Sequence, residues 1–163
     1  MPDLVQHCLA PKGSLTFALE TFSAQARCAC CGIAGTNASV SGKRICVVCA
    51  PALCVDEPDI DTFSTIIWLP HIDQGFLNRL ARAAYAARYV SEHAQPDEIV
   101  RASRAYEMLS ELERLRTKAK QIIGTDQVSL LRRVIPSMPQ YTLFLRNKRV
   151  SGLRILPLGP WFD

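Results

Sequence analysis

Two Cys-x-x-Cys pairs constrain this chain more than any other feature of its sequence. Cys28 and Cys31 form the first pair, Cys46 and Cys49 form the second, and fourteen residues separate the two pairs. Two such knuckles can bring four thiolates to one tetrahedral ion at about 2.3 Å, as in structural zinc sites. Gly32 suits a turn that folds back over the sulfurs, because glycine has no Cβ. We therefore predict one structural Zn²⁺ bound by these four cysteines.

Other interpretations of the seven cysteines remain open at this point. Four cysteines can also hold an iron–sulfur cluster, and free thiols are often simply buried as small hydrophobes. A thioredoxin-like redox role is disfavoured, since neither pair clearly begins a helix within a strand–helix–strand unit. The three cysteines outside the pairs, Cys8, Cys30 and Cys54, are expected to be packing thiols.

Composition places the chain among ordinary globular proteins. Of its 163 residues, 48% are hydrophobic and 21% are charged, which excludes a disordered tail or a fibrous repeat. A chain of this length buries roughly 70% of its unfolded surface and needs no metal merely to be stable. The net charge of +4 falls short of that of a dedicated nucleic-acid binder.

The N-terminus and the apolar runs bear on location. Met1 to Gly13 contains no apolar run after a basic start, so we expect no secretory signal. The apolar stretch Ile66 to Pro70 is far shorter than the ~20 residues of a membrane helix. A cytoplasmic protein with reduced cysteines and no direct membrane insertion is therefore expected.

Periodicity and breaker residues predict a mixture of helices and strands. The expected helices are Ser14 to Arg27 (with the start of a strand as the alternative), Asp73 to Val90, one capped by Asp97 that ends at Ile123 before Gly124, a short one capped by Asp126, and one from Ser137 to about Val150. The expected strands are Arg44 to Val48 and Thr62 to Leu69, with a surface loop over Val55 to Asp61.

These elements predict a single α+β domain over residues 1–163. A treble-clef or HNH-like zinc module with a short strand pair is expected over about residues 20–70, packed on a mainly helical part over about 73–150. The apolar tail, residues 151–163, is expected to lie extended on the core.

Several segments, in order, resemble one known family. RCACCG, ICVVC, the strand IIWLP and the helix DQGFLNRLARAAY are similar to the IcmJ (DotN) family of type IVB secretion systems and its TraT-like conjugation relatives. In that family, a zinc knuckle precedes a strand ending Leu-Pro and a helix beginning Gln-x-x-Leu-Asn. This chain has Leu69 and Pro70 at the end of the strand, and Gln74, Leu77 and Asn78 at the start of the helix. With GTDQVSLL and LRILP, the resemblance covers roughly residues 15–158.

The resemblance implies an HNH-like zinc fold and a place in a type IV coupling complex. Such a cytoplasmic subunit binds the tail of the coupling ATPase and other subunits, and it helps to recruit substrates for conjugation or effector export. No small-molecule substrate is implied.

The residues themselves argue against an enzyme. Residues 32–45 contain no histidine, so the position of an HNH general base is empty, and four cysteine ligands leave no open position for an activated water. His71 and His93 are expected to be loop histidines. The alternative function is a zinc-knuckle nucleic-acid-binding accessory or regulatory protein, for which the basic segment Arg146 to Arg154 would supply the contact surface.

Overall fold

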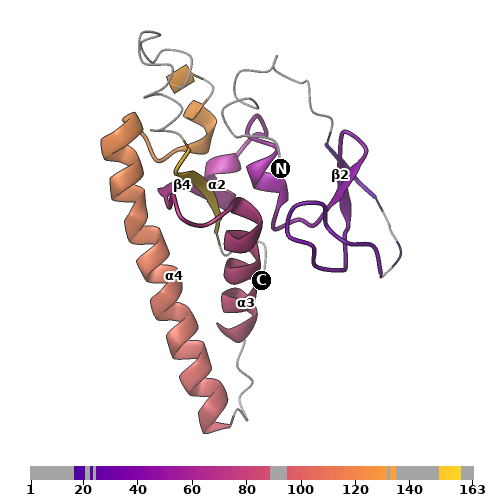
Figure 1. Cartoon of the computed structure of the whole chain (residues 1–163), viewed down its shortest axis with the longest axis vertical. Helices are drawn as coiled ribbons and strands as arrows, with labels where there is room; N and C mark the ends of the chain where they lie inside the picture. Colours follow the sequence, from indigo (N-terminus) through magenta and orange to yellow (C-terminus); the bar gives the residue numbers. More distant parts are fainter. Residues whose placement is uncertain are drawn as a thin grey trace.

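The computed structural model describes residues 17–20, 23, 25–88, 95–131, 133–134 and 151–158. Within these ranges the chain is a mixture of helix and strand with two small antiparallel sheets (Figure 1). The α-helices are α2 (Ile60–Phe63), α3 (Gln74–Arg88) and α4 (Pro96–Ile123), and the 3₁₀ helices are η1 (Ala50–Ala52) and η2 (Val128–Leu130). The strands are β1 (Phe17–Leu19), β2 (Ala38–Val40), β3 (Lys43–Ile45), β4 (Ser64–Trp68) and β5 (Leu153–Pro157).

The first sheet has the order β1-β2-β3, and residues of β2 and β3 pack in one core with the cysteine pairs. A tight turn at Ser41 and Gly42 joins β2 to β3, and both residues have a positive φ, of 48° and 76°. Two successive positive φ values are typical of the hairpin turn whose twist matches that of the strands. We call β1 together with residues 25–54 the knuckle module.

The helix predicted over Ser14 to Arg27 is wrong where the structure describes it. Phe17–Leu19 form β1, paired in antiparallel register with Ala38–Val40, as in the alternative interpretation. Pairing with the hairpin satisfies the backbone of these residues, and such tertiary contacts override a weak helix propensity. The predicted strand at Arg44 is shorter and earlier than expected, because the chain turns into the second knuckle after Ile45.

The second sheet pairs two segments that are far apart in the sequence. Strand β4 confirms the predicted strand, although the first residues of that prediction belong to α2, and it pairs antiparallel with β5. Of the tail expected to lie extended on the core, Leu153–Pro157 are thus hydrogen-bonded into a sheet, and residues 159–163 lie outside the described residues. Side chains on β4 alternate between two cores: Ile66 packs with the end of α4, and Ile67 packs between α3 and α4.

Helix α3 confirms the predicted helix and its cap. The Asp73 Oδ1 accepts a hydrogen bond of 2.8 Å from the backbone N–H of Phe76, which satisfies a donor at the helix start. Apolar residues of α3 pack against α4, so that the two helices lie side by side with α3 nearer the knuckle module (Figure 1).

Helix α4 has the predicted end but a different start. Gly124 adopts a φ of +82° and closes the helix as expected. The N-cap is Gln95 rather than Asp97, because Gln95 and Glu98 form a capping box and Pro96 takes the first helical position, where its missing N–H costs nothing.

Asp126 does not cap a helix, contrary to the prediction. Its Oδ2 accepts hydrogen bonds from the Arg116 Nε and Nη2 at 3.0 and 2.9 Å, and the chain continues into η2. The Asp126 carboxylate therefore pairs with a guanidinium on α4, and η2 has Gln127 as its N-cap with no side-chain cap hydrogen bond.

Some predictions lie outside the described residues. These are the helix from Ser137, most of the basic segment before Ser151, and the residues Cys8 and His93. Arg154, which ends that basic segment, lies in strand β5. No helix in the described part of the chain combines the length and the hydrophobicity that a membrane span requires.

Candidate metal centre

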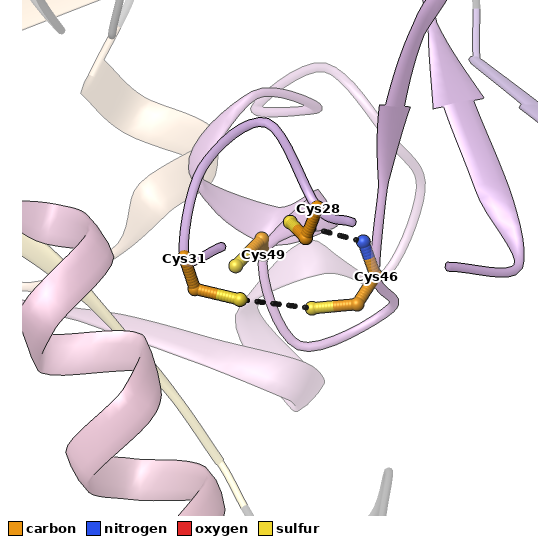
Figure 2. A group of neighbouring side chains, drawn as sticks. All are labelled: Cys28, Cys31, Cys46 and Cys49. Atoms are coloured by element: carbon orange, nitrogen blue, oxygen red, sulfur yellow. Dashed lines mark hydrogen bonds between the residues drawn. The ribbon is translucent and has the colours of Figure 1, made fainter. Parts of the chain in front are cut away.

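The structure brings the four predicted ligands together in one buried cluster. The Sγ atoms of Cys28, Cys31, Cys46 and Cys49 all lie within 4.8 Å of one another, and all four residues are buried (Figure 2). The Sγ atoms of Cys31 and Cys46 are 3.8 Å apart. With metal–sulfur bonds of about 2.3 Å, the sulfurs of a regular tetrahedron stand about 3.8 Å apart. The donor set therefore fits a single tetrahedral metal ion.

Local backbone geometry turns the first pair toward this centre. The N–H of Gly32 donates to the Cys28 carbonyl at 2.8 Å, and the N–H of Cys28 donates to the Ile33 carbonyl at 2.9 Å. Gly32 has a φ of +74°, a conformation that L side chains rarely adopt. This confirms the turn predicted directly after Cys31, where a residue without a Cβ is favoured.

The second pair is held by the first and by the hairpin. The backbone N–H of Cys46 donates to the Cys28 Sγ at 3.3 Å, an amide–sulfur hydrogen bond across the cluster (Figure 2). Asn37 accepts a hydrogen bond of 3.2 Å from the N–H of Val47 through its Oδ1. The amide–sulfur bond would stabilise a thiolate at Cys28, and the bond to Asn37 fixes the backbone between the two cysteines of the second pair.

Electrostatics within the cluster favour a bound cation. Hydrogen bonds from the side chains of Cys46 and Cys49 lower the pKa of Cys28 far below its usual range. Hydrogen bonding to Cys28 raises the pKa of Cys49 well above its usual range. Cysteine binds a metal as the thiolate, so a divalent cation held by all four sulfurs would displace their protons.

Two arginines surround the first knuckle with positive charge. The Nη1 of Arg27 donates to the Gly32 carbonyl at 3.0 Å, and the Nη1 of Arg79 donates to the Cys31 carbonyl at 2.9 Å. Four thiolates around a divalent ion leave a net charge of −2, and two nearby guanidinium groups offset it.

Helix α3 docks on the knuckle module through residues that sequence reasoning did not assign to the site. Gly75 approaches the backbone of Cys30 closely, and the Nδ2 of Asn78 lies 3.1 Å from the Cys49 Sγ. With Arg79, these residues follow helical spacing on one face of α3. The signal available in the sequence was a polar Asn78 among the helix positions that are otherwise buried and apolar, such as Leu77 and Ala81.

The cysteines outside the pairs differ in their surroundings. Cys30 and Cys54 are half-buried and pack against the core of the knuckle module. Burial raises the pKa of the Cys54 thiol to about 12, so this side chain stays neutral. The Cys30 Sγ lies 3.7 Å from the Asn78 Nδ2, at the edge of the cluster. His71 is exposed, as expected for a loop histidine.

Comparison with models of known protein families finds no match for this chain, and comparison with curated proteins finds no significant similarity.

Proposed function

We propose that the protein is a non-catalytic, zinc-stabilised cytoplasmic subunit of a type IVB-like coupling complex, which binds the coupling ATPase and supports substrate recruitment. The observation that carries this proposal is the position of the residues that resemble the IcmJ (DotN) family. Gln74 and Asn78, from the Gln-x-x-Leu-Asn motif, lie on the helix that docks on the four-cysteine centre. The motif and the centre therefore form one structural unit.

The chemistry of the centre favours zinc in a structural role. Four sulfur donors complete a tetrahedral shell, so a bound water has no place and a treble-clef, HNH-like module of this kind would serve as a scaffold. Metal analysis of protein purified without chelator is expected to give one zinc per chain. Iron with visible absorbance, or no bound metal, would contradict the zinc assignment.

The described surface offers apolar side chains to a protein partner. Exposed large hydrophobic residues lie on α3 and on the first half of α4: Phe76, Ile99, Val100 and Tyr106. Aromatic anchors such as Phe76 and Tyr106 contribute strongly to protein interfaces. Docking of an extended or helical tail through such anchors would depend little on salt.

Co-expression with a type IV coupling ATPase, followed by size-exclusion chromatography, tests the proposed role. The two proteins are expected to elute together at low and high salt. Separate elution, together with retardation of DNA that weakens steeply with salt, would favour the nucleic-acid-binding alternative instead. Nuclease assays with divalent ions are expected to show no cleavage.

A further inference from the structure

Asn78 is a fully buried polar side chain between the four-cysteine centre and the β4–β5 sheet. Only 1% of the residue is exposed. Its Nδ2 lies 3.1 Å from the Cys49 Sγ, and its Oδ1 accepts a hydrogen bond of 2.9 Å from the Gln74 Nε2. A buried amide is costly unless both of its ends are satisfied, and here both are.

Strand β5 determines which way both amide side chains point. The backbone N–H of Ile155 can only donate, and it does so to the Gln74 Oε1 at 2.9 Å. The other end of Gln74 is therefore the Nε2, which donates to the Ile155 carbonyl at 2.6 Å and to the Asn78 Oδ1. Asn78 must then turn its own NH₂ group toward the sulfur. Both amide orientations therefore follow from one group, the backbone N–H of Ile155, which can act only as a donor.

We propose that Asn78 is a positioning residue of the metal centre, and that Gln74 couples this centre to strand β5. The inference rests on the metal site of the proposed function. With a metal bound, the Asn78 Nδ2 would donate to the Cys49 thiolate, stabilise its charge and hold its side chain in place. Gln74 keeps the Asn78 amide from flipping. The position of β5 is thereby linked to the state of the metal ligands.

This coupling is reciprocal by thermodynamic linkage. A bound metal keeps Cys49 as a thiolate, which strengthens the Asn78 hydrogen bond and so stabilises the Gln74 contacts with Ile155. Conversely, loss of these contacts weakens metal binding. Metal binding at the four cysteines is therefore expected to affect the stability of the β4–β5 sheet, which lies outside the knuckle module.

Two isosteric substitutions in the full-length protein test the role of the amides. Asn78→Asp replaces the donor with a carboxylate that repels the thiolate. Gln74→Glu removes the donor to Asn78 but keeps an oxygen for the Ile155 N–H, so the Asn78 amide is free to turn its oxygen toward Cys49. Asp126→Asn, which weakens an ion pair elsewhere, is the control.

Zinc affinity, measured by competition with a chromophoric chelator, is the first readout. Each isosteric variant is expected to bind zinc roughly 10- to 100-fold more weakly than wild type, and the control is expected to match wild type. Cobalt loading gives a second readout, because the sulfur-to-cobalt charge-transfer bands are expected to shift in Asn78→Asp. Affinities within about threefold of wild type for both variants, with unchanged cobalt spectra, would overturn the proposal.

Hydrogen exchange separates coupling from a merely local role. Removal of zinc from wild type is expected to speed exchange of the Ile155 amide by about 5- to 150-fold. The Ile66 amide, which donates to the Asp126 carbonyl at 2.9 Å, should change much less. Equal acceleration at both amides would indicate global unfolding and overturn the coupling. Failure of wild type to bind any zinc would instead remove the metal site itself, and this role with it.

Discussion

Gly75 lies so close to Cys30 that a Cβ atom on the glycine would stand 2.3 Å from the Cys30 carbonyl oxygen. That oxygen belongs to the backbone of the first knuckle, so it cannot move without moving the cysteine ligands on either side. The contact lets the first turn of α3 approach the centre closely enough for Asn78 to reach Cys49. Helix and knuckle are therefore packed through a position that only glycine fits.

Gly75→Ala is expected to destabilise the protein by about 1–3 kcal/mol, the usual cost of overpacking. It should also speed the loss of zinc to a chelator, because the first knuckle must shift. Gly124→Ala is the matched control: it strains a φ of +82° but meets open space, far from the cysteines in sequence. Urea unfolding and metal-release kinetics measure the two effects. Equal release rates in both variants would contradict the packing role of Gly75.

Removal of one cysteine of the cluster is expected to abolish stable zinc binding. Cys31→Ser or Cys46→Ser forfeits much of a metal-binding free energy of ~10–16 kcal/mol, which is also folding energy of the knuckle module. Cys54→Ser, outside the cluster, should keep one zinc per chain and cost about 1 kcal/mol in packing. Metal content and thermal melting compare the three variants. Indistinguishable melts would show that the cluster does not hold a structural metal.

The buried Tyr85 predicts a specific loss of stability at high pH. Its hydroxyl donates to the Pro157 carbonyl at 3.1 Å, and burial, followed by the charge of Glu113, raises its pKa to about 12. In the unfolded chain tyrosine titrates near pH 10. Between about pH 10 and 12 the unfolded state therefore loses a proton that the folded state keeps, and the free energy of unfolding falls as pH rises.

Tyr85→Phe isolates this contribution. The variant is expected to be about 1 kcal/mol less stable than wild type near pH 8, because the Pro157 carbonyl loses its partner. The difference should shrink as the pH rises above about 10, since phenylalanine does not titrate. Urea unfolding of both proteins across this range gives the difference directly, and other titrating groups cancel. A difference that stays constant with pH would contradict the prediction.

The pair of Arg116 and Asp126 is expected to stabilise the end of α4 modestly. The two side chains are 42% and 17% exposed, so solvent screens their attraction. Asp126→Asn should cost about 1 kcal/mol at low salt and less in high salt. Zinc affinity should not change. Urea unfolding at two salt concentrations is the measurement, and a cost that grows with salt would rule out an electrostatic origin.

Local patterns in the sequence determined several elements of this protein. The spacing of two cysteine pairs predicted the four side chains that cluster, because a knuckle needs only a short turn to direct two sulfurs to one point. Apolar periodicity with Asp73 as the cap predicted α3, and a β-branched run before Pro70 predicted β4. In each case the deciding interactions lie within a few residues along the chain.

Only the tertiary structure decided the remaining features. Phe17–Leu19 became a strand because a distant hairpin offered hydrogen bonds, and Asp126 bound Arg116 instead of capping a helix. Asn78 gained its place at the centre through Gln74 and Ile155, the latter 77 positions further along the chain. No local pattern encodes such partners, because the direction of a buried amide depends on which backbone groups the fold brings beside it.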